Sequence, residues 1–507
     1  MTDFSVPQRM GFGAFVIYFL KFFRLTFNAS IIYMAYTLFQ SDGDLTKTIL
    51  KIAAIVGCTT IFALILASLA IFQMKFHVED GNLIYRHNLI SRATTTIPLS
   101  RIHTLRTRQG LLYRLFDLIG VLFDTLAAKE EEIELVLSES DWQSLLSRIE
   151  RQELTQSAVS NMPPAYNPSS FIEFSNKDLV FDALCQNHLK GMMVLGGFVS
   201  VIFNTLSDFS ENSIELIEGY IKSHFDQFAL SVTGVALIMA CTYIVSLVLW
   251  LGKVLLRYYN LSLTYNSKML TFSHGLFSRL SSRFTRDKIC TVWIKRNYFE
   301  KRFGLSTIAL RQALNSSAKK EDDNLKIYGR DYYDFFLCWW LGQDYGQEAD
   351  IATAKSGKGV ISHSLLSDVL LSSVAIAVLW HFGLYVWTIL PATYLLAGIP
   401  KGILTMRHSH ITLKESYLIV NNGCFAETKN YLKYDNIEVV RITRTPLSRF
   451  TGRVSLSIST TGTSFTIRSL RQEQAMNIYE LLLAKPQKIA RKSHKDSSQH
   501  YAECKMT

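Results

Sequence analysis

The sequence is poor in charged residues, and this scarcity excludes an ordinary large soluble protein. Asp, Glu, Lys and Arg make up only 19% of the 507 residues, whereas apolar residues make up 49% and the mean hydropathy is +0.15. A chain of this length divides into several domains. Such an apolar composition in addition indicates membrane segments.

Cysteine pairs and catalytic motifs are also lacking. The seven cysteines form no CxxC pair and no closely spaced framework, which argues against a disulfide-stapled scaffold and a cysteine zinc site. HExxH and GxSxG do not occur, and Lys355–Gly359 lacks the spacing of a phosphate-binding loop. The sequence therefore predicts a protein that is not an enzyme and needs no cofactor, although an active site assembled from distant residues is the lowest-ranked alternative.

Three apolar regions predict membrane hairpins. The expected spans are Leu25–Phe39 with Ile49–Met74, Gly191–Leu206 with Phe228–Leu251, and two short spans within Leu365–Met406. Because Lys21 and Arg24 interrupt the N-terminal apolar run, the first hairpin reads as a retained anchor and not as a cleaved signal peptide. The third region is also long enough for one tilted span plus an interfacial segment.

The distribution of basic residues decides between two spans and one. After the third region come Arg441, Arg444, Arg449, Arg453, Lys485, Lys488, Arg491, Lys492 and Lys495. Cytoplasmic segments carry an excess of Lys and Arg. We therefore expect six spans in the inner membrane of the cell, with the modules between them and both termini in the cytoplasm.

A module that recurs three times is the strongest signal in the sequence. Stretches starting at Phe76, Leu263 and Ile411 align without a gap over about forty positions. Each begins with alternating apolar residues around a polar turn, which is typical of a β-hairpin with one buried face. A further alternating strand follows in all three. Copies one and three then end in an amphipathic helix that can close a small sheet, whereas copy two ends more loosely at Asp331–Trp340.

The order of these segments resembles the YdbT-like family of bacterial PH-domain membrane proteins. The matching segments are Ile97–Ile102 (Ile-Pro-Leu-Ser-Arg-Ile), Gly275–Phe277 (Gly-Leu-Phe) and Lys301–Leu305 (Lys-Arg-Phe-Gly-Leu). The resemblance implies an α+β membrane protein, in which each transmembrane hairpin is followed by a PH-like β-barrel or sandwich module closed by a C-terminal helix. It implies little about biochemical activity.

These observations together predict a division of the chain into ten segments. They are an interfacial segment (1–24), hairpin 1 (25–74), module 1 (75–152), a linker (153–188), hairpin 2 (189–254), module 2 (255–341), a linker (342–363), hairpin 3 (364–405), module 3 (406–484) and a basic flexible tail (485–507).

Basic residues recur after the same stretch of every module. They are Arg106, Arg108 and Arg114, then Lys295, Arg296, Lys301 and Arg302, and finally Arg441, Arg444, Arg449 and Arg453. Because each module is tethered to a span, these residues are candidate contacts to anionic headgroups or to a partner. The alternative is a solvated face that only determines topology.

Other ligands are less well supported by the residue pattern. No aromatic-interleaved stacking motif or helix-turn-helix accompanies the charge, which argues against nucleic acid. The first hairpin turns lack a Lys and Arg cluster for inositol phosphates. His408 and His410 alternate as strand residues do, and without a nearby third ligand they favour a juxtamembrane strand over a metal site.

The predicted function is a membrane-anchored scaffold that presents three cytoplasmic modules to proteins, to anionic lipids or to both. Expected partners are membrane lipids and other membrane or cytoplasmic proteins, including a smaller PH-like companion or a second copy of the chain. The alternative is a transporter or channel with regulatory modules. It is less favoured because the expected spans contain almost no charge beyond Asp368 and no helix break beyond Pro391.

Overall fold

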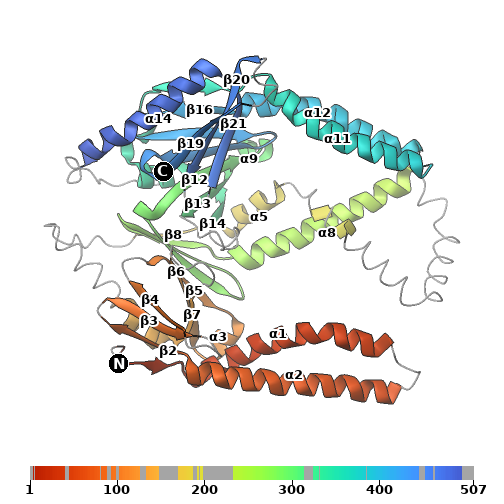
Figure 1. Ribbon diagram of the computed structural model, residues 1–507, viewed down its shortest axis with the longest axis vertical. Coiled ribbons are helices and arrows are strands. Elements are labelled where there is room, and N and C mark those ends of the chain that lie inside the picture. The colour runs from red at the N-terminus through yellow and green to blue at the C-terminus, as the bar shows by residue number, and fades with distance from the viewer. Residues whose placement is uncertain are drawn as a thin grey trace. The chain divides into compact units, whose positions relative to one another are not determined.

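The computed structural model describes most of the hairpins and modules (Figure 1). The described residues are 4, 6–39, 45–79, 81–87, 93–98, 102–125, 133–147, 170–186, 191–192, 195–197, 232–312, 324–330, 332–383, 385–444, 451–460 and 463–493. Most of the predicted span Gly191–Leu206, Arg449 and the end of the basic tail lie outside this part of the chain. The chain divides into two compact units, of which the first holds 1–172, 262–285 and 315–317.

Apolar helices form where the sequence predicts hairpins. Within the described residues, five helices are long and apolar enough to cross a membrane. The first hairpin is α1 (Phe12–Phe39) and α2 (Leu45–Gln73), and the third is α11 (Gly359–His381) and α12 (Ile389–His408). Helix α8 (Val232–Tyr258) covers most of the second predicted span of the middle hairpin.

The first helix begins earlier than the sequence analysis expects. Its apolar window is Gly13–Ile31, so residues 12–24 belong to the helix and do not form a separate surface segment. Lys21 does not end the helix because lysine is a good helix former. Its ammonium group lies 5.9 Å from the centre of the Tyr18 ring.

Each module begins with a three-stranded antiparallel arrangement. These strands are β2 (Lys75–Glu79), β3 (Asn82–His87) and β4 (Ala93–Pro98) in module 1, β9 (Ser262–Tyr265), β10 (Met269–His274) and β11 (Arg279–Thr285) in module 2, and β16 (His410–Leu413), β17 (Tyr417–Gly423) and β18 (Glu427–Lys433) in module 3. The predicted alternating pattern is confirmed as strands in all three copies.

A second antiparallel trio completes each module. These strands are β5 (Ile102–Gln109), β6 (Leu118–Thr125) and β7 (Ile133–Ser138), then β12 (Ile289–Arg296), β13 (Leu305–Gln312) and β14 (Asn324–Arg330), and finally β19 (Ile437–Thr443), β20 (Arg453–Thr460) and β21 (Thr463–Arg471). The closing helices are residues 139–147, α10 (Tyr333–Leu341) and α14 (Gln472–Ser493).

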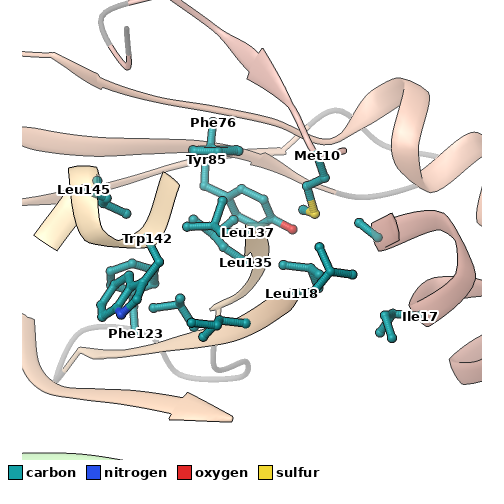
Figure 2. Close-up of a cluster of buried hydrophobic side chains, with 14 of the residues drawn as sticks. Met10, Ile17, Phe76, Tyr85, Leu118, Phe123, Leu135, Leu137, Trp142 and Leu145 are labelled. Atoms are coloured by element: carbon teal, nitrogen blue, oxygen red, sulfur yellow. The ribbon is translucent and has the colours of Figure 1, made fainter. Parts of the chain in front are cut away.

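Module 1 buries its apolar residues between two sheet layers and its closing helix. Phe76 and Leu83 from the first trio share a core with Val121 and Leu135 from the second. Figure 2 shows Trp142 of the closing helix against the same cluster. Module 3 is built in the same way around Ile411, Leu432, Leu456, Ile467 and Ile478. These two modules are therefore two-layer sandwiches plugged by a helix, one of the two forms that the sequence predicts.

A short strand precedes each hairpin and joins the sheet of the module that follows it. These strands are β1 (Gln8–Arg9), β8 (Ser170–Glu173) and β15 (Ala352–Lys355). In the third repeat, β15 pairs antiparallel with β16, so that Ala352 lies opposite Leu413. Strand β15 lies before α11 and β16 after α12, so the chain returns from the hairpin to the sheet that it left.

Neighbouring modules also share sheets. The strand order β7-β6-β5-β11-β10-β9-β8 joins the second trio of module 1 to the first trio of module 2. The order β14-β13-β12-β18-β17-β16-β15 joins modules 2 and 3 in the same way. We refer to the pair β5·β11 as the first junction and to β12·β18 as the second junction.

Candidate membrane-binding site

A short helix at the end of β12 holds apolar side chains in an exposed position. Helix α9 (Tyr298–Phe303) begins with a capping box, in which the Asn297 side chain accepts a hydrogen bond from the Glu300 amide and the Glu300 carboxylate accepts one from the Asn297 amide. It ends at Gly304, whose φ of 66° lies in the left-handed region that favours glycine. Both ends of this single turn are thus fixed by the sequence.

Three aromatic residues of α9 point away from the protein. Tyr298, Phe299 and Phe303 are 75%, 59% and 66% exposed. Single exposed apolar side chains are common, but a cluster of large ones marks a surface that binds a partner or a membrane. The basic residues Lys301 and Arg302 lie on the same turn and are exposed too. This combination suits the boundary between lipid chains and headgroups.

The hairpin tip next to α9 lies against a membrane span. The backbone oxygen of Cys424 lies 2.8 Å from Nδ1 of His408, at the end of α12. The Cys424 thiol donates a hydrogen bond of 3.3 Å to the backbone oxygen of Lys401. Lys401 precedes His408 by seven residues, which is about 10 Å along α12 at 1.5 Å per residue. The adjacent Phe425, which is 71% exposed, therefore lies level with the last turns of the span.

The second junction brings α9 to the same end of the sheet as this tip. Arg296, the last residue of β12, lies opposite Glu427, the first residue of β18. Nζ of Lys301 lies 2.5 Å from Oε2 of Glu427. We refer to Tyr298, Phe299, Phe303 and Phe425 with Lys301 and Arg302 as the aromatic rim.

Module 1 carries a similar set of residues at the first junction. Helix α3 (Leu111–Leu115) follows β5 and exposes Leu111, Leu112 and Leu115. Gln109 lies opposite Arg279, so α3 is next to the tip that carries the exposed Leu276 and Phe277. That tip belongs to the sheet that the chain enters at β9, directly after span α8 ends at Tyr258.

Two buried acidic side chains lie at the buried side of α9. Glu300 and Asp182 of helix α5 (Asn176–Leu184) are both fully buried. The Thr307 hydroxyl donates to Asp182 at 3.4 Å, and the Asn297 amide group donates to the backbone oxygen of Cys185 at 2.7 Å. Burial, aided by the charge of Glu300, raises the pKa of Asp182 to about 8. Burial also raises the pKa of Glu300.

The predicted basic residues fall into three structural groups. Lys301, Arg302, Arg108, Arg441 and Arg444 are exposed, whereas Arg106, Arg114, Lys295, Arg296 and Arg453 are partly buried. Arg296 lies over the Tyr333 ring at 5.4 Å, and Arg453 donates to the backbone oxygen of Ser469 at 2.9 Å. Arg449 lies outside the described residues. The structure thus places Lys301 and Arg302 together beside exposed aromatic side chains.

The two predicted histidine candidates contact different groups. His408 is the last residue of α12, whereas His410 begins β16, and its Nε2 lies 3.4 Å from Nδ2 of Asn421. Burial lowers the pKa of His410. Among the residues that the structure describes, no group of three His, Cys, Asp or Glu side chains could hold a metal ion.

A polar pocket of about 770 Å³ lies beside the start of α11. Its lining includes Lys355, His410, Arg453, Arg471 and Asp350. Arg453 is one of the predicted headgroup contacts, and in this pocket its guanidinium donates a hydrogen bond to the backbone oxygen of Ser469. Asp350 adds a negative charge to the lining, and its carboxylate pairs with Lys414 at 2.7 Å.

The third hairpin contains an ion pair that the sequence analysis missed. Nζ of Lys401 in α12 lies 2.9 Å from Oδ2 of Asp368 in α11, and Asp368 is almost fully buried. The Tyr394 hydroxyl also donates to Asp368, at 3.1 Å. The spans therefore hold more charge than Asp368 alone, contrary to our expectation. The two residues are far apart in sequence, and only the α11·α12 pairing brings them together.

Exposed aromatic residues were the other feature that sequence reasoning missed. In the sequence, Tyr298, Phe299 and Phe303 resemble core residues of an amphipathic turn. The available signal was the Asn297 and Glu300 pair, which predicts a capped helix turn too short to bury three rings.

Comparison with known proteins places the repeat in a known family. The family model described as "Bacterial PH domain" matches three times, at residues 16–153, 202–332 and 362–486. Each match takes in residues of a hairpin and the module after it. The chain is also 22% identical, over 272 residues, to the UPF0699 transmembrane protein YdbT of Bacillus subtilis (strain 168). That match spans 50% of this chain and 52% of the relative, about half the length of each.

Proposed function

The chain belongs to the bacterial PH domain family. We propose that it is a multipass inner-membrane protein with cytoplasmic modules, and that the aromatic rim and the similar set of residues at the first junction insert into the anionic leaflet. The observation that carries this proposal is the aromatic rim beside span α12. In this proposal the protein is a membrane-bound binding platform and not an enzyme, and lipid is the ligand of the aromatic rim.

The pairing of strands across the hairpins supports six spans. Strand β1 pairs with β2 across the first hairpin, and β15 pairs with β16 across the third. A hairpin whose flanking strands share a sheet leaves and returns on one side of the membrane, which requires an even number of crossings. The basic residues after Met406 then favour the cytoplasm for that side.

Rim insertion has a favourable free energy of useful size. An aromatic side chain buries roughly 200 Å², and the rim rings are about two-thirds exposed. At roughly 25 cal/mol per Å², each ring contributes at most about 3 kcal/mol on entering an apolar environment. Each basic residue near an anionic surface adds about 1 kcal/mol.

Insertion of the aromatic rim would fix the orientation of the modules at the membrane surface. It would add little to membrane attachment. The spans already hold the protein in the bilayer, so the rim acts at a high effective concentration of lipid. A docked rim fixes the orientation of the module and leaves its other surfaces open to protein partners, among them a smaller PH-like companion.

The Asp368–Lys401 pair favours a second candidate function, transport. Ionisable groups within spans are costly and often mark ion or substrate pathways. Substrate-dependent flux in proteoliposomes that is lost in Lys401→Ala would support this alternative. A pair that serves only to join α11 and α12 gives no flux in either protein.

Spin labelling of the full-length protein in nanodiscs tests the rim. A label on Phe299→Cys, in a background with the exposed Cys58 and Cys241 replaced by alanine, should collide more with oxygen than with a water-soluble nickel complex. A label on Met476→Cys, an exposed position of α14, should show the reverse. Equal access of the nickel complex to both labels would defeat the proposal.

A further inference from the structure

The two junctions between modules use the same strands in the same register. At the first junction Ser281 lies opposite Thr107, and at the second Lys429 lies opposite Ile294. Ser281 and Lys429 occupy one repeat position, and Thr107 and Ile294 occupy another, in the alignment that starts at Phe76, Leu263 and Ile411. The junction is thus a repeated head-to-tail contact between the fourth strand of one module and the third strand of the next.

This repetition leaves two complementary strands at sheet edges. In the sheets formed by the described residues, β4 of module 1 is the end strand of the order β1-β2-β3-β4, and β19 of module 3 is the end strand of β19-β20-β21. The equivalents of β4 are β11 and β18, and the equivalents of β19 are β5 and β12. All four of these equivalents are paired at a junction.

Other end strands do not show this contrast. Strands β7, β14 and β21 are end strands in all three modules, and the first strand of each module is covered by β1, β8 or β15. Among the strands that the structure describes, only the third and fourth strands of a module are paired at a junction in some modules and lie at a sheet edge in others. The open edges of β4 and β19 therefore correspond to an interface that the fold already builds twice.

Strand β19 has the shape and surface of a junction strand. A register irregularity occurs at the same repeat position in β5, β12 and β19, so the irregularity does not prevent pairing. Thr291 of β12 is 0% exposed beneath the second junction, whereas its equivalent Val439 of β19 is 47% exposed. An exposed β-branched edge strand is a template for another strand.

We propose that β19 of one copy pairs antiparallel with β4 of a second copy, and so extends the junction between molecules. The register of the two existing junctions predicts that Arg441 lies opposite Thr95 and Ile442 opposite Thr94. Pro98 falls one residue beyond the last pair of the second junction, so its missing N–H does not interrupt the predicted pairing. Such a contact is heterologous, and it produces a closed ring or an open row of copies.

Cysteine cross-linking of the full-length protein in nanodiscs and in native membranes tests the register. Arg441→Cys mixed with Thr95→Cys should cross-link between copies several-fold more than Arg441→Cys mixed with Thr94→Cys, because a shift of one residue points the side chains to opposite faces. Each single variant alone reports cross-links to native cysteines. Equal yields from the two mixtures, or capture of Arg441→Cys only by a different protein, would overturn the proposal.

A substitution at the edge tests the same contact without cysteines. Val439→Lys places a charge in the predicted interface and should shift the particle mass toward the single chain. Met476→Lys is the matched control, because Met476 is 44% exposed in the same module but lies on α14. If both variants keep the mass of the unaltered protein, or if that protein is already a single chain at all concentrations, the assignment fails.

Discussion

Replacement of Asp182 by asparagine should stabilise the protein in alkaline solution and have little effect in acid. Asp182 is 0% exposed and lies on α5 beneath the capping box of α9. Burial raises its pKa from 3.8 to about 8. The folded state therefore holds the Asp182 proton more tightly than the unfolded state does.

The sign and size of the effect follow from this shift. Because the folded state raises the pKa of Asp182, this group adds to the free energy of unfolding. The contribution is fully present below about pH 4 and is lost as the pH rises toward 8. Each unit corresponds to about 1.4 kcal/mol, so the loss between pH 6 and pH 8 is at most about 3 kcal/mol. Asparagine cannot ionise, so the Asp182→Asn variant should lose less stability over the same pH range. Glu300, whose pKa burial raises as well, leaves some pH dependence.

Thermal unfolding of the full-length protein in detergent, followed by tryptophan fluorescence, measures this difference. Module 2 supplies the buried reporters Trp339 and Trp340. At roughly 2–4 °C per kcal/mol, the unfolding midpoint of the unaltered protein should fall by several degrees, and by no more than about 12 °C, between pH 6 and pH 8. Asp178→Asn, on the same helix, removes only a surface ion pair with Arg330. The reasoning would be refuted if the unfolding midpoint changed with pH equally in the unaltered protein and in Asp182→Asn.

Two further predictions concern the third hairpin. A Cβ atom on Gly402 would lie 3.0 Å from Cγ2 and 3.2 Å from Cα of Ile361, so Gly402→Leu should force α11 and α12 apart and cost about 1–3 kcal/mol. Gly252→Leu on α8, where a Cβ meets nothing within 4 Å, should leave the unfolding midpoint unchanged; equal losses would contradict the close packing. Lys401→Ala leaves Asp368 buried without its cation and should cost about 3–5 kcal/mol. Asp368→Asn with Lys401→Gln should recover most of that loss, and a double variant as unstable as the single one would argue against a paired charge.

Much of the architecture could be predicted from the sequence because it rests on local patterns. Alternation around Leu83, Leu270 and Leu418 marks strands in any context where one face is buried, and these residues are fully buried in the structure. The apolar runs likewise specify helices by length and composition. The repeat start points at Phe76, Leu263 and Ile411 are confirmed as the first strands of the modules.

Long-range pairing could not be predicted in the same way. The alternation in β5 and β12 shows which side chains face inward, but not whether the strand edge pairs within its own module or with the next one. The same limit applies to the partners Asp182 and Glu300, which are brought together by the packing of α5 under α9. Among the candidate basic residues, Arg296 and Lys301 look alike in sequence, yet one lies over the Tyr333 ring and the other joins the aromatic rim.

Photo-cross-linking of the unaltered protein to lipid tests the central claim most directly. In nanodiscs that contain a photoactivatable anionic phospholipid, mass spectrometry should find lipid adducts on the peptides that hold Phe299 and Phe425 as well as on the spans. Replacement of the anionic probe by a zwitterionic one should lower the rim adducts more than the span adducts. Adducts confined to the spans with both probes would contradict a module whose rim enters the leaflet.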